Sequence, residues 1–269
     1  MQNQGILAEF YVSIQKRVIM KLLNYPGIII LIILIASCKK DSATQPTDSR
    51  EILIRLRHVS MGEKLGQGKA LTDSSGTVIS LSKFQYYLSG IRLESENPME
   101  TFREPQSYHL IKALDNMGET VLRLKSVPES SFQNLVLQIG LDSITNGSKG
   151  GQGVLDPGNG MYWPWSSEYK FLVMEGNFNY PDTSGAFLFH VAGNSCFRTL
   201  RIPINSAGKD VELANGSQIV LDVELSALTG APNPVNFRIT NNVMSVAAGA
   251  GKLADNYAAG SFIRFAGIQ

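Results

Sequence analysis

The sequence predicts an all-β fold, an antiparallel β-sandwich of immunoglobulin-like or related topology with long glycine-rich loops. Three observations support this prediction. Short runs of Val, Ile, Leu, Phe and Tyr recur along a chain that also holds 25 Gly and 11 Pro. No helix-length amphipathic stretch separates these runs, as βαβ units would require. The hydrophobic share of 43% and the net charge of +1 exclude a disordered chain and a strongly basic nucleic-acid binder.

Residues 1–37 have the features of a secretory signal peptide. Residues 28–36 form an apolar run that is shorter than the roughly 20 residues needed to span a bilayer. Basic residues precede this run and small residues follow it, which is the order found in signal peptides. Met20, followed directly by Lys21, is a more typical start than Met1 and is therefore an alternative start of translation.

Cys38 is expected to carry a lipid. Residues 35–38 read Ile-Ala-Ser-Cys, which matches the bacterial lipobox of an aliphatic residue, two small residues and a cysteine that becomes the first mature residue. The alternative is a buried strand that ends in Cys38. Residues 38–50 are polar and lack periodicity, so we expect a flexible tether between the lipid and a domain at residues 51–269. The protein would then be held by its lipid outside the cytoplasm, at the outer membrane or the periplasmic face.

Without residues 1–37 the protein is close to neutral. Of its 24 Lys and Arg and 23 Asp and Glu, 21 and 22 remain, which gives no electrostatic reason to expect a nucleic-acid partner. Cys196 is then the single thiol of the domain, and its neighbours Phe197 and Leu200 favour burial over reactivity. No HExxH, CxxC or GxSxG motif and no Ser/His/Asp set stands out, so we do not expect an enzyme.

The strands are expected to begin near residue 50. Ile52, Ile54 and Leu56 alternate with their neighbours at the period of two that is typical of a half-buried strand. Asn-Gly pairs at 146/147, 159/160 and 215/216 predict turns with positive φ, and residues 145–160 form a long glycine-rich loop. Further strands are expected at 78–81, 86–93, 135–139, 170–174, 186–191, 200–204 and 219–225, with turns or bulges at Gly76 and Gly90 and a short helix at 247–256.

Both tryptophans of the chain lie in one block, residues 155–165, which reads Leu-Asp-Pro-Gly-Asn-Gly-Met-Tyr-Trp-Pro-Trp. Upstream come Tyr-Tyr-Leu-Ser at 86–89 and Gly-Leu-Asp-Ser at 140–143, and downstream a strand with His190 and Gly193. From Arg50 to the end, this order of motifs resembles the MbnP-like family, periplasmic copper-binding proteins named for one associated with methanobactin.

The resemblance implies an exported β-sandwich that binds copper. In the family, a tryptophan is oxidised to kynurenine by a partner dihaem enzyme of the cytochrome c peroxidase type, and the kynurenine amine then binds copper together with histidines. The chemistry is consistent, because an indole N–H is only a hydrogen-bond donor whereas an aryl amine has a nitrogen lone pair. In one related arrangement a histidine stands two residues after the modified tryptophan, a position that Trp165 occupies here.

The candidate copper ligands are His190, His58, Trp163 as kynurenine, and Trp165. His190 lies in an apolar strand that follows the tryptophan block, and His58 ends the first strand of the domain and could meet it across the sheet. The alternative is that they are ordinary core residues. Pro164 favours an edge or loop position for the tryptophans, which would leave one indole accessible to an oxidant.

Other donors have simpler explanations. Met161 and Met174 are expected to fill the core, although a thioether can bind Cu(I). His109 is expected to be structural. Oxygens of Asp142, Asn146, Asp156 and Asn159 around the glycine-rich loop could hold Ca²⁺, but Asx residues in such loops more often close turns on their own backbone.

Two functions from different classes therefore remain. The first is a lipid-anchored protein that binds or handles copper, which the intact Trp-x-Trp block favours. The second is a metal-free cell-surface interaction or structural module, which the presence of only three histidines favours.

Overall fold

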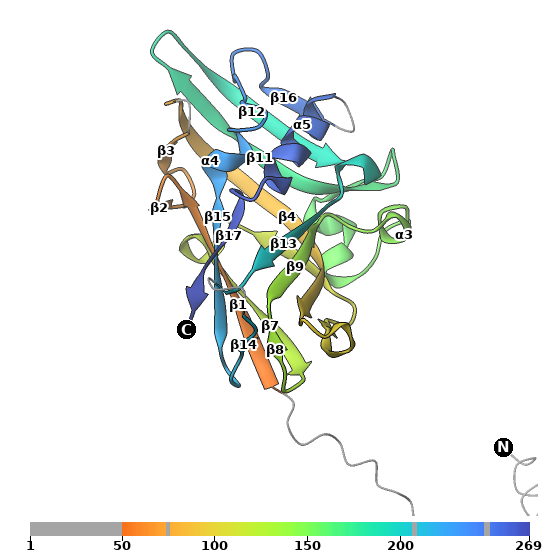
Figure 1. Cartoon of the computed structure of the whole chain (residues 1–269). Helices are drawn as coiled ribbons and strands as arrows, with labels where there is room; N and C mark the ends of the chain where they lie inside the picture. Colours follow the sequence, from red (N-terminus) through yellow and green to blue (C-terminus); the bar gives the residue numbers. More distant parts are fainter. Residues whose placement is uncertain (1–49, 74–75, 206–208, 245–247) are drawn as a thin grey trace, which may run out of the picture. The chain divides into compact units, whose positions relative to one another are not determined.

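Two β-sheets of mostly antiparallel strands carry the described part of the chain (Figure 1). The computed structural model describes residues 50–73, 76–205, 209–244 and 248–269; the expected signal peptide, Cys38 and the tether up to residue 49 lie outside the described residues. The smaller sheet contains β17 (Ile263–Ile268), β15 (Gln218–Glu224), β1 (Arg50–Ser60), β2 (Glu63–Lys64) and β7 (Glu119–Val127). The larger contains β13 (Arg198–Pro203), β9 (Asn134–Ile139), β4 (Val78–Glu94), β11 (Glu168–Tyr180), β12 (Thr183–Ala192) and β16 (Asn242–Met244), with β3 (Ala70–Thr72), β5 (Phe102–Arg103), β6 (Tyr108–Lys112) and β10 (Tyr162–Trp163) beside them. A small pair joins β8 (Ser131–Phe132) to β14 (Val211–Glu212).

The two sheets face each other across an apolar core, which confirms the predicted sandwich. Every second residue of β1 from Ile52 to Ser60 is buried, as the alternation predicted. The ring of His58, in this buried row, lies against Phe84 and Tyr86 of β4, with ring centroids 6.3 and 5.9 Å away. The inner faces of β1 and β4 are therefore in contact.

The long strand β4 organises the larger sheet. The sequence predicted two strands here, but the chain continues through Gly90, which has φ of 57° and lies at a shift in register between Ser89 and Arg92. A glycine tolerates this left-handed conformation at little cost, so the position is a bulge, one of the two alternatives expected. Residues 78–86 of β4 pair with β11, and residues 88–94 pair with β9.

Two strand pairs depart from the antiparallel expectation. β1 pairs with β15 in parallel, and so does β12 with β16. Parallel partners need long connections, which the strand spacing in the sequence could not reveal. The second of these pairs places β16 beside β12, on the side away from β11.

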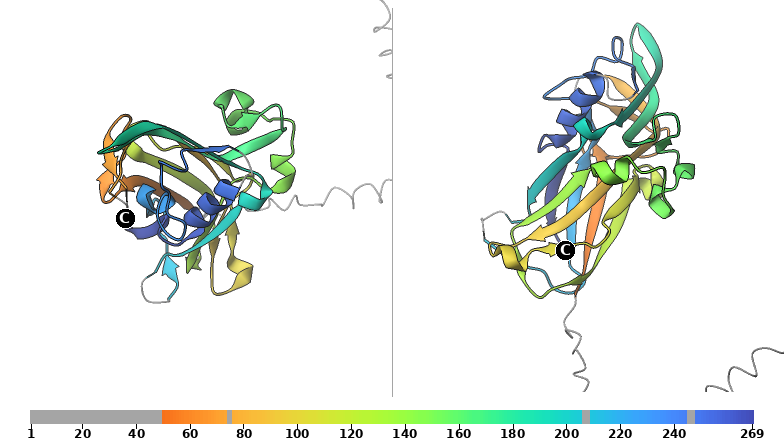
Figure 2. Two further views of the ribbon diagram at one scale, coloured as in Figure 1. Left: turned by 90° about the horizontal axis from the view of Figure 1, so that it is seen from above. Right: turned by 90° about the vertical axis from the view of Figure 1, so that its right-hand side faces the viewer.

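The glycine-rich loop is more ordered than its composition indicated. It contains α3 (Ser143–Asn146) and two short 3-10 helices, and it stands out from the strand layers in both views of Figure 2. Gly160 and Gly216 adopt the predicted positive φ, at 75° and 84°. The prediction was wrong for Gly147, which has φ of −82° because it ends α3 rather than forming a hairpin turn.

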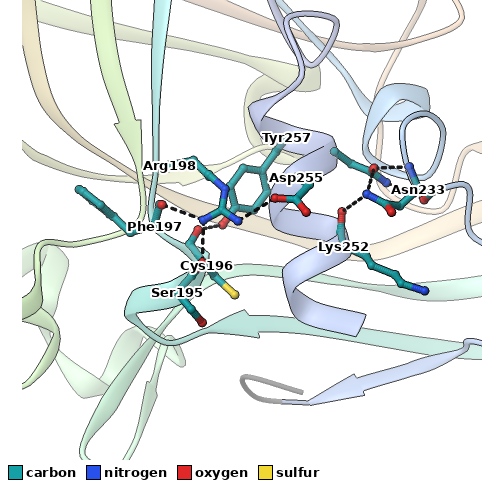
Figure 3. Close-up of polar contacts among 9 residues, drawn as sticks. Ser195, Cys196, Phe197, Arg198, Asn233, Lys252, Asp255 and Tyr257 are labelled. Atoms are coloured by element: carbon teal, nitrogen blue, oxygen red, sulfur yellow. Dashed lines mark hydrogen bonds and ion pairs between the residues drawn. The ribbon is translucent and has the colours of Figure 1, made fainter. Parts of the chain in front are cut away.

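The predicted C-terminal helix is α5 (Ala248–Ala258), which lies against β12 and β13. Figure 3 shows how it is held: the Tyr257 hydroxyl donates to the Cys196 carbonyl, and Arg198 Nη2 lies 2.7 Å from Asp255 Oδ1. Cys196 is buried as expected, and burial raises the pKa of its thiol. A second short helix, α4 (Leu225–Leu228), follows β15. Among the described residues, no helix is long and apolar enough to cross a membrane.

Candidate metal centre at the tryptophan hairpin

The tryptophan block forms a tight hairpin between β10 and β11. Trp163 pairs with Glu168, and the Trp163 carbonyl accepts the backbone N–H groups of Ser166 and Ser167 at 3.2 and 2.9 Å. Ser167 has φ of 54°, so the turn closes with one residue in the left-handed region. Pro164 therefore lies in a turn, where its missing N–H removes no bond of the ladder.

The hairpin separates the two indoles by exposure. The Trp163 side chain is covered, with 6% of its surface exposed, whereas Trp165 is 71% exposed. Their rings lie 5.0 Å apart between centroids at an angle of 33°. One indole is thus accessible from solvent, as the position of Pro164 predicted, and it covers the other.

His190 lies beside the buried indole. Its ring centroid is 6.0 Å from that of Trp163, and its Nε2 lies 2.7 Å from Oε1 of Glu175 on the neighbouring strand β11. The other ring nitrogen, Nδ1, is buried and has no hydrogen-bond partner among the described residues. If Nε2 carries the proton and donates it to the carboxylate, Nδ1 holds a free lone pair.

Charges around His190 favour this neutral form. Burial is the largest cause that lowers the pKa of His190, and the ammonium groups of Lys170 and Lys83 lower it further, while the Glu175 carboxylate opposes them. Lys170 is itself buried, and its ammonium lies 5.6 Å from the centre of the Trp163 ring. Burial lowers the pKa of Lys170 as well. The lowered pKa favours the neutral imidazole, which is the form that can bind a metal.

Strand register adds neighbours to this site. Gln85, Val173, His190 and Met244 are paired in a row across β4, β11, β12 and β16, so their side chains share one face of the larger sheet. We call this the outer face, because the adjacent Tyr86 points to the core between the sheets. Met244, at the end of this row, is 46% exposed.

The structure does not bring His58 to this site. Its Nδ1 lies 2.8 Å from the Gly118 carbonyl and its Nε2 lies 2.8 Å from the Tyr86 hydroxyl. Because Tyr86 follows Gln85 in β4, His58 and His190 lie on opposite faces of the larger sheet. Burial lowers the pKa of His58 to about 4. The expectation that the two histidines meet across the sheet was therefore wrong: both nitrogens of His58 are used within the core.

The remaining donors considered from the sequence have other partners. Met161 and Met174 are fully buried, as expected of core residues. Nε2 of His109 lies 2.7 Å from Glu104 Oε2. Within the described ranges, no group of three or more His, Cys, Asp or Glu side chains is arranged to hold a metal ion.

The carboxylates of the glycine-rich loop cap their own backbone. Asp142 Oδ1 accepts the N–H groups of Ile144 and Thr145 at 3.1 and 3.0 Å. Asp156 Oδ1 accepts the N–H of Gly158 at 2.7 Å. These are the local turn bonds that the sequence offered as the simpler explanation, and they leave Ca²⁺ without support at these two residues.

Sequence reasoning missed Glu175 and Met244 as parts of the site. Glu175 contacts His190 across the β11–β12 pair, and Met244 is paired with His190 between the parallel strands β12 and β16. The sequence could not show either alignment. The only available signal was the Glu175–Gly176 pair, which directly follows the predicted strand at 170–174.

Comparison with known proteins gives one family and one structure. The family model described as MbnP matches residues 49–245. The solved structure of MbnP from Methylosinus trichosporium is 14% identical, and the alignment covers 76% of this chain and 93% of that chain at a TM-score of 0.45. No curated protein matches the chain.

Proposed function

Because this chain belongs to the MbnP family, we propose that it is an extracytoplasmic protein that binds copper as its cargo, at the site formed by His190 and the tryptophan hairpin. Family membership supplies the link to copper, and the residues of this chain support the position. The protein would take up or hold the metal rather than catalyse a reaction on it.

The observation that carries the proposal is the environment of His190. Metal-binding histidines commonly donate one ring N–H to a carboxylate, which fixes the tautomer and leaves the other nitrogen for the metal. His190 has this arrangement with Glu175, at 2.7 Å, and its Nδ1 is buried without a partner in the described structure. Leaving a polar atom unpaired in this way costs about 1–3 kcal/mol, so a ligand for Nδ1 would remove a cost of folding.

His190 and Glu175 alone make a weak donor set, and this is the reason to include Trp163. An unmodified indole has no lone pair to offer a metal, whereas kynurenine carries an aryl amine. Trp163 is the better candidate for this change, since its ring lies 6.0 Å from that of His190. Copper accepts imidazole and amine nitrogen, so the oxidised hairpin would provide two nitrogen donors on one face of the sheet.

The oxidant would be a peroxide-dependent dihaem partner. One indole and two molecules of hydrogen peroxide give N-formylkynurenine and two of water, and hydrolysis then releases formate and leaves kynurenine. The hairpin is at the surface, with Trp165 exposed above Trp163. A partner protein could therefore reach the hairpin without unfolding the domain.

The proposal includes membrane attachment through Cys38, which lies outside the described residues. A lipid there would attach the domain to the membrane through the polar residues 39–49, because β1 begins at Arg50. Cys38→Ala should release the protein from the membrane fraction or stall its processing, and Cys196→Ala is the matched control. Unchanged membrane association of the Cys38→Ala variant would refute lipid attachment at this residue.

The direct test is the intact mass and metal content of protein purified from its native host. Conversion of one tryptophan to kynurenine raises the mass of the peptide that contains Trp163 by about four daltons. Copper should accompany this change, and a Trp163→Phe variant should bind copper more weakly. Native protein with unmodified tryptophans and no copper would move the conclusion to the alternative function.

That alternative is a metal-free interaction module at the cell surface. It is favoured by the sparse conventional ligands among the described residues and by apolar side chains exposed near the site, with Trp165 at 71%, Met244 at 46% and Leu188 at 38%. Such side chains are common where proteins bind each other.

A further inference from the structure

We propose that Met244 is a further ligand of this site, a thioether that binds the metal together with His190. The inference rests on the proposed function, because it concerns the same copper site. It is needed because the site is short of donors: His190 has one nitrogen without a partner in the described structure, and His58 contacts the other face of the larger sheet.

Position is the first argument. Met244 is the register partner of His190 in the parallel pair of β12 and β16. Adjacent strands lie about 4.8 Å apart, and residues paired in this way project to the same face. The methionine side chain is long and unbranched, so its sulfur can reach a metal bound to the neighbouring imidazole.

The orientation of the His190 ring is the second argument. Glu175, on β11, holds Nε2, and β16 flanks β12 on the opposite side. Nδ1, the nitrogen without a partner in the described structure, is therefore not engaged with the β11 side. Met244 is the residue of β16 that is paired with His190.

Exposure is the third argument. His190 has 7% of its surface exposed, so a metal ion must pass its neighbours to reach Nδ1. Met244, 46% exposed at the end of the row, is open to solvent and is paired with the buried His190. A large exposed apolar side chain on a short edge strand also has little to contribute to folding, which leaves room for a role in binding.

Charge and softness make a thioether suitable here. Lys170 and Lys83 act on His190 as positive charges, and Glu175 is the carboxylate that opposes them. A cation with a single charge is repelled less by these lysines than a divalent one. Thioether sulfur prefers Cu(I), the singly charged form. Met244 and the nearby lysines would therefore both favour Cu(I) over Cu(II).

The test is titration with Cu(I) against a competing chromogenic chelator, using the full chain purified from its native host. Met244→Leu keeps the volume and removes the sulfur, and we expect the Cu(I) affinity to fall by about tenfold or more, since losing even outer contacts of a metal site weakens binding by this much. Met99→Leu is the matched control, because Met99 is 92% exposed and lies in a different part of the fold. Met244→His should retain much of the affinity by supplying a nitrogen in place of the sulfur.

A second readout concerns the wild-type protein alone. X-ray absorption of the copper-loaded protein should contain a copper–sulfur distance, and Met244→Leu should lose it, while the metal-free unfolding midpoint stays unchanged. If the wild type binds copper without a sulfur neighbour, or if Met244→Leu binds equally well, Met244 is not a ligand and the proposed function stands. If the native wild type binds no copper, both proposals fall.

Discussion

Two buried histidines of this protein lie on opposite faces of one sheet, and they differ in how their nitrogens are used. His58, in the core between the sheets, has a carbonyl and a hydroxyl each 2.8 Å from its ring nitrogens. His190, on the outer face, has a carboxylate at 2.7 Å from one nitrogen and no described partner for the other. A histidine whose two ring nitrogens both have hydrogen-bond partners has a structural role. A histidine with one unpaired nitrogen, and a carboxylate that orients the ring through the other, is suited to bind a ligand.

The largest expected difference between His58 and His190 is in the free energy of unfolding that each contributes. His58→Ala leaves a cavity and two unpaired polar groups, so we expect the free energy of unfolding to fall on the order of 4 kcal/mol. His190→Ala removes one hydrogen bond together with an unpaired nitrogen, so the loss should be roughly 1 kcal/mol. Denaturant unfolding followed by circular dichroism measures both, and equal losses would remove the distinction between a structural and a ligand histidine.

We expect acid to destabilise the folded protein through protonation of His58. Burial lowers its pKa to about 4 from the 6.5 of a free histidine, so below pH 6.5 the unfolded chain takes up a proton that the folded chain does not. Stability is therefore full above pH 6.5 and falls as the pH drops toward 4, by about 3 kcal/mol from this residue. His58→Gln removes this contribution. A pH profile of unfolding identical in the variant and the wild type would contradict the assignment.

The carboxylate partner of His190 should matter for metal affinity. Glu175→Gln keeps the size of the side chain but loses the charge that orients and polarises the imidazole, so copper affinity should fall about 10- to 100-fold. The chain offers a matched control in Glu104→Gln, because Glu104 lies 2.7 Å from His109 in the same kind of pair. Equal effects of the two variants on copper titration would show that the Glu175 contact is only structural.

The smallest expected effect comes from the different solvent exposure of the two tryptophans. Trp165 is 71% exposed and Trp163 is 6% exposed. In protein with unmodified tryptophans, acrylamide should quench mainly the fluorescence of Trp165. Trp165→Phe should therefore remove most of the quenchable fluorescence, and Trp163→Phe should leave it. Replacing the exposed ring should change the unfolding free energy by no more than about 0.5 kcal/mol. Strong quenching in both variants would mean that both rings are accessible.

The sequence predicted the fold well and the site only in part. Alternation in β1 and the apolar runs of β9, β11, β12, β13 and β15 were readable because side-chain direction has a period of two in any strand. Which residues face each other across strands depends on register and on parallel pairing, which are set by the whole fold. For this reason Trp163, Trp165 and His190 were found from the sequence, while Glu175 and Met244 were not. The position of His58 was predicted wrongly, because the sequence around a strand residue does not show which face of a neighbouring sheet it will contact.

The central claim is that copper binds at His190 and not at His58, and one titration tests it most directly. Protein from the native host would be titrated with Cu(I) as wild type, as His190→Gln and as His58→Gln, with circular dichroism confirming that each variant is folded. We predict that His190→Gln loses most of its copper affinity and that His58→Gln keeps it. Equal affinity in all three proteins, or loss only in His58→Gln, would contradict the account.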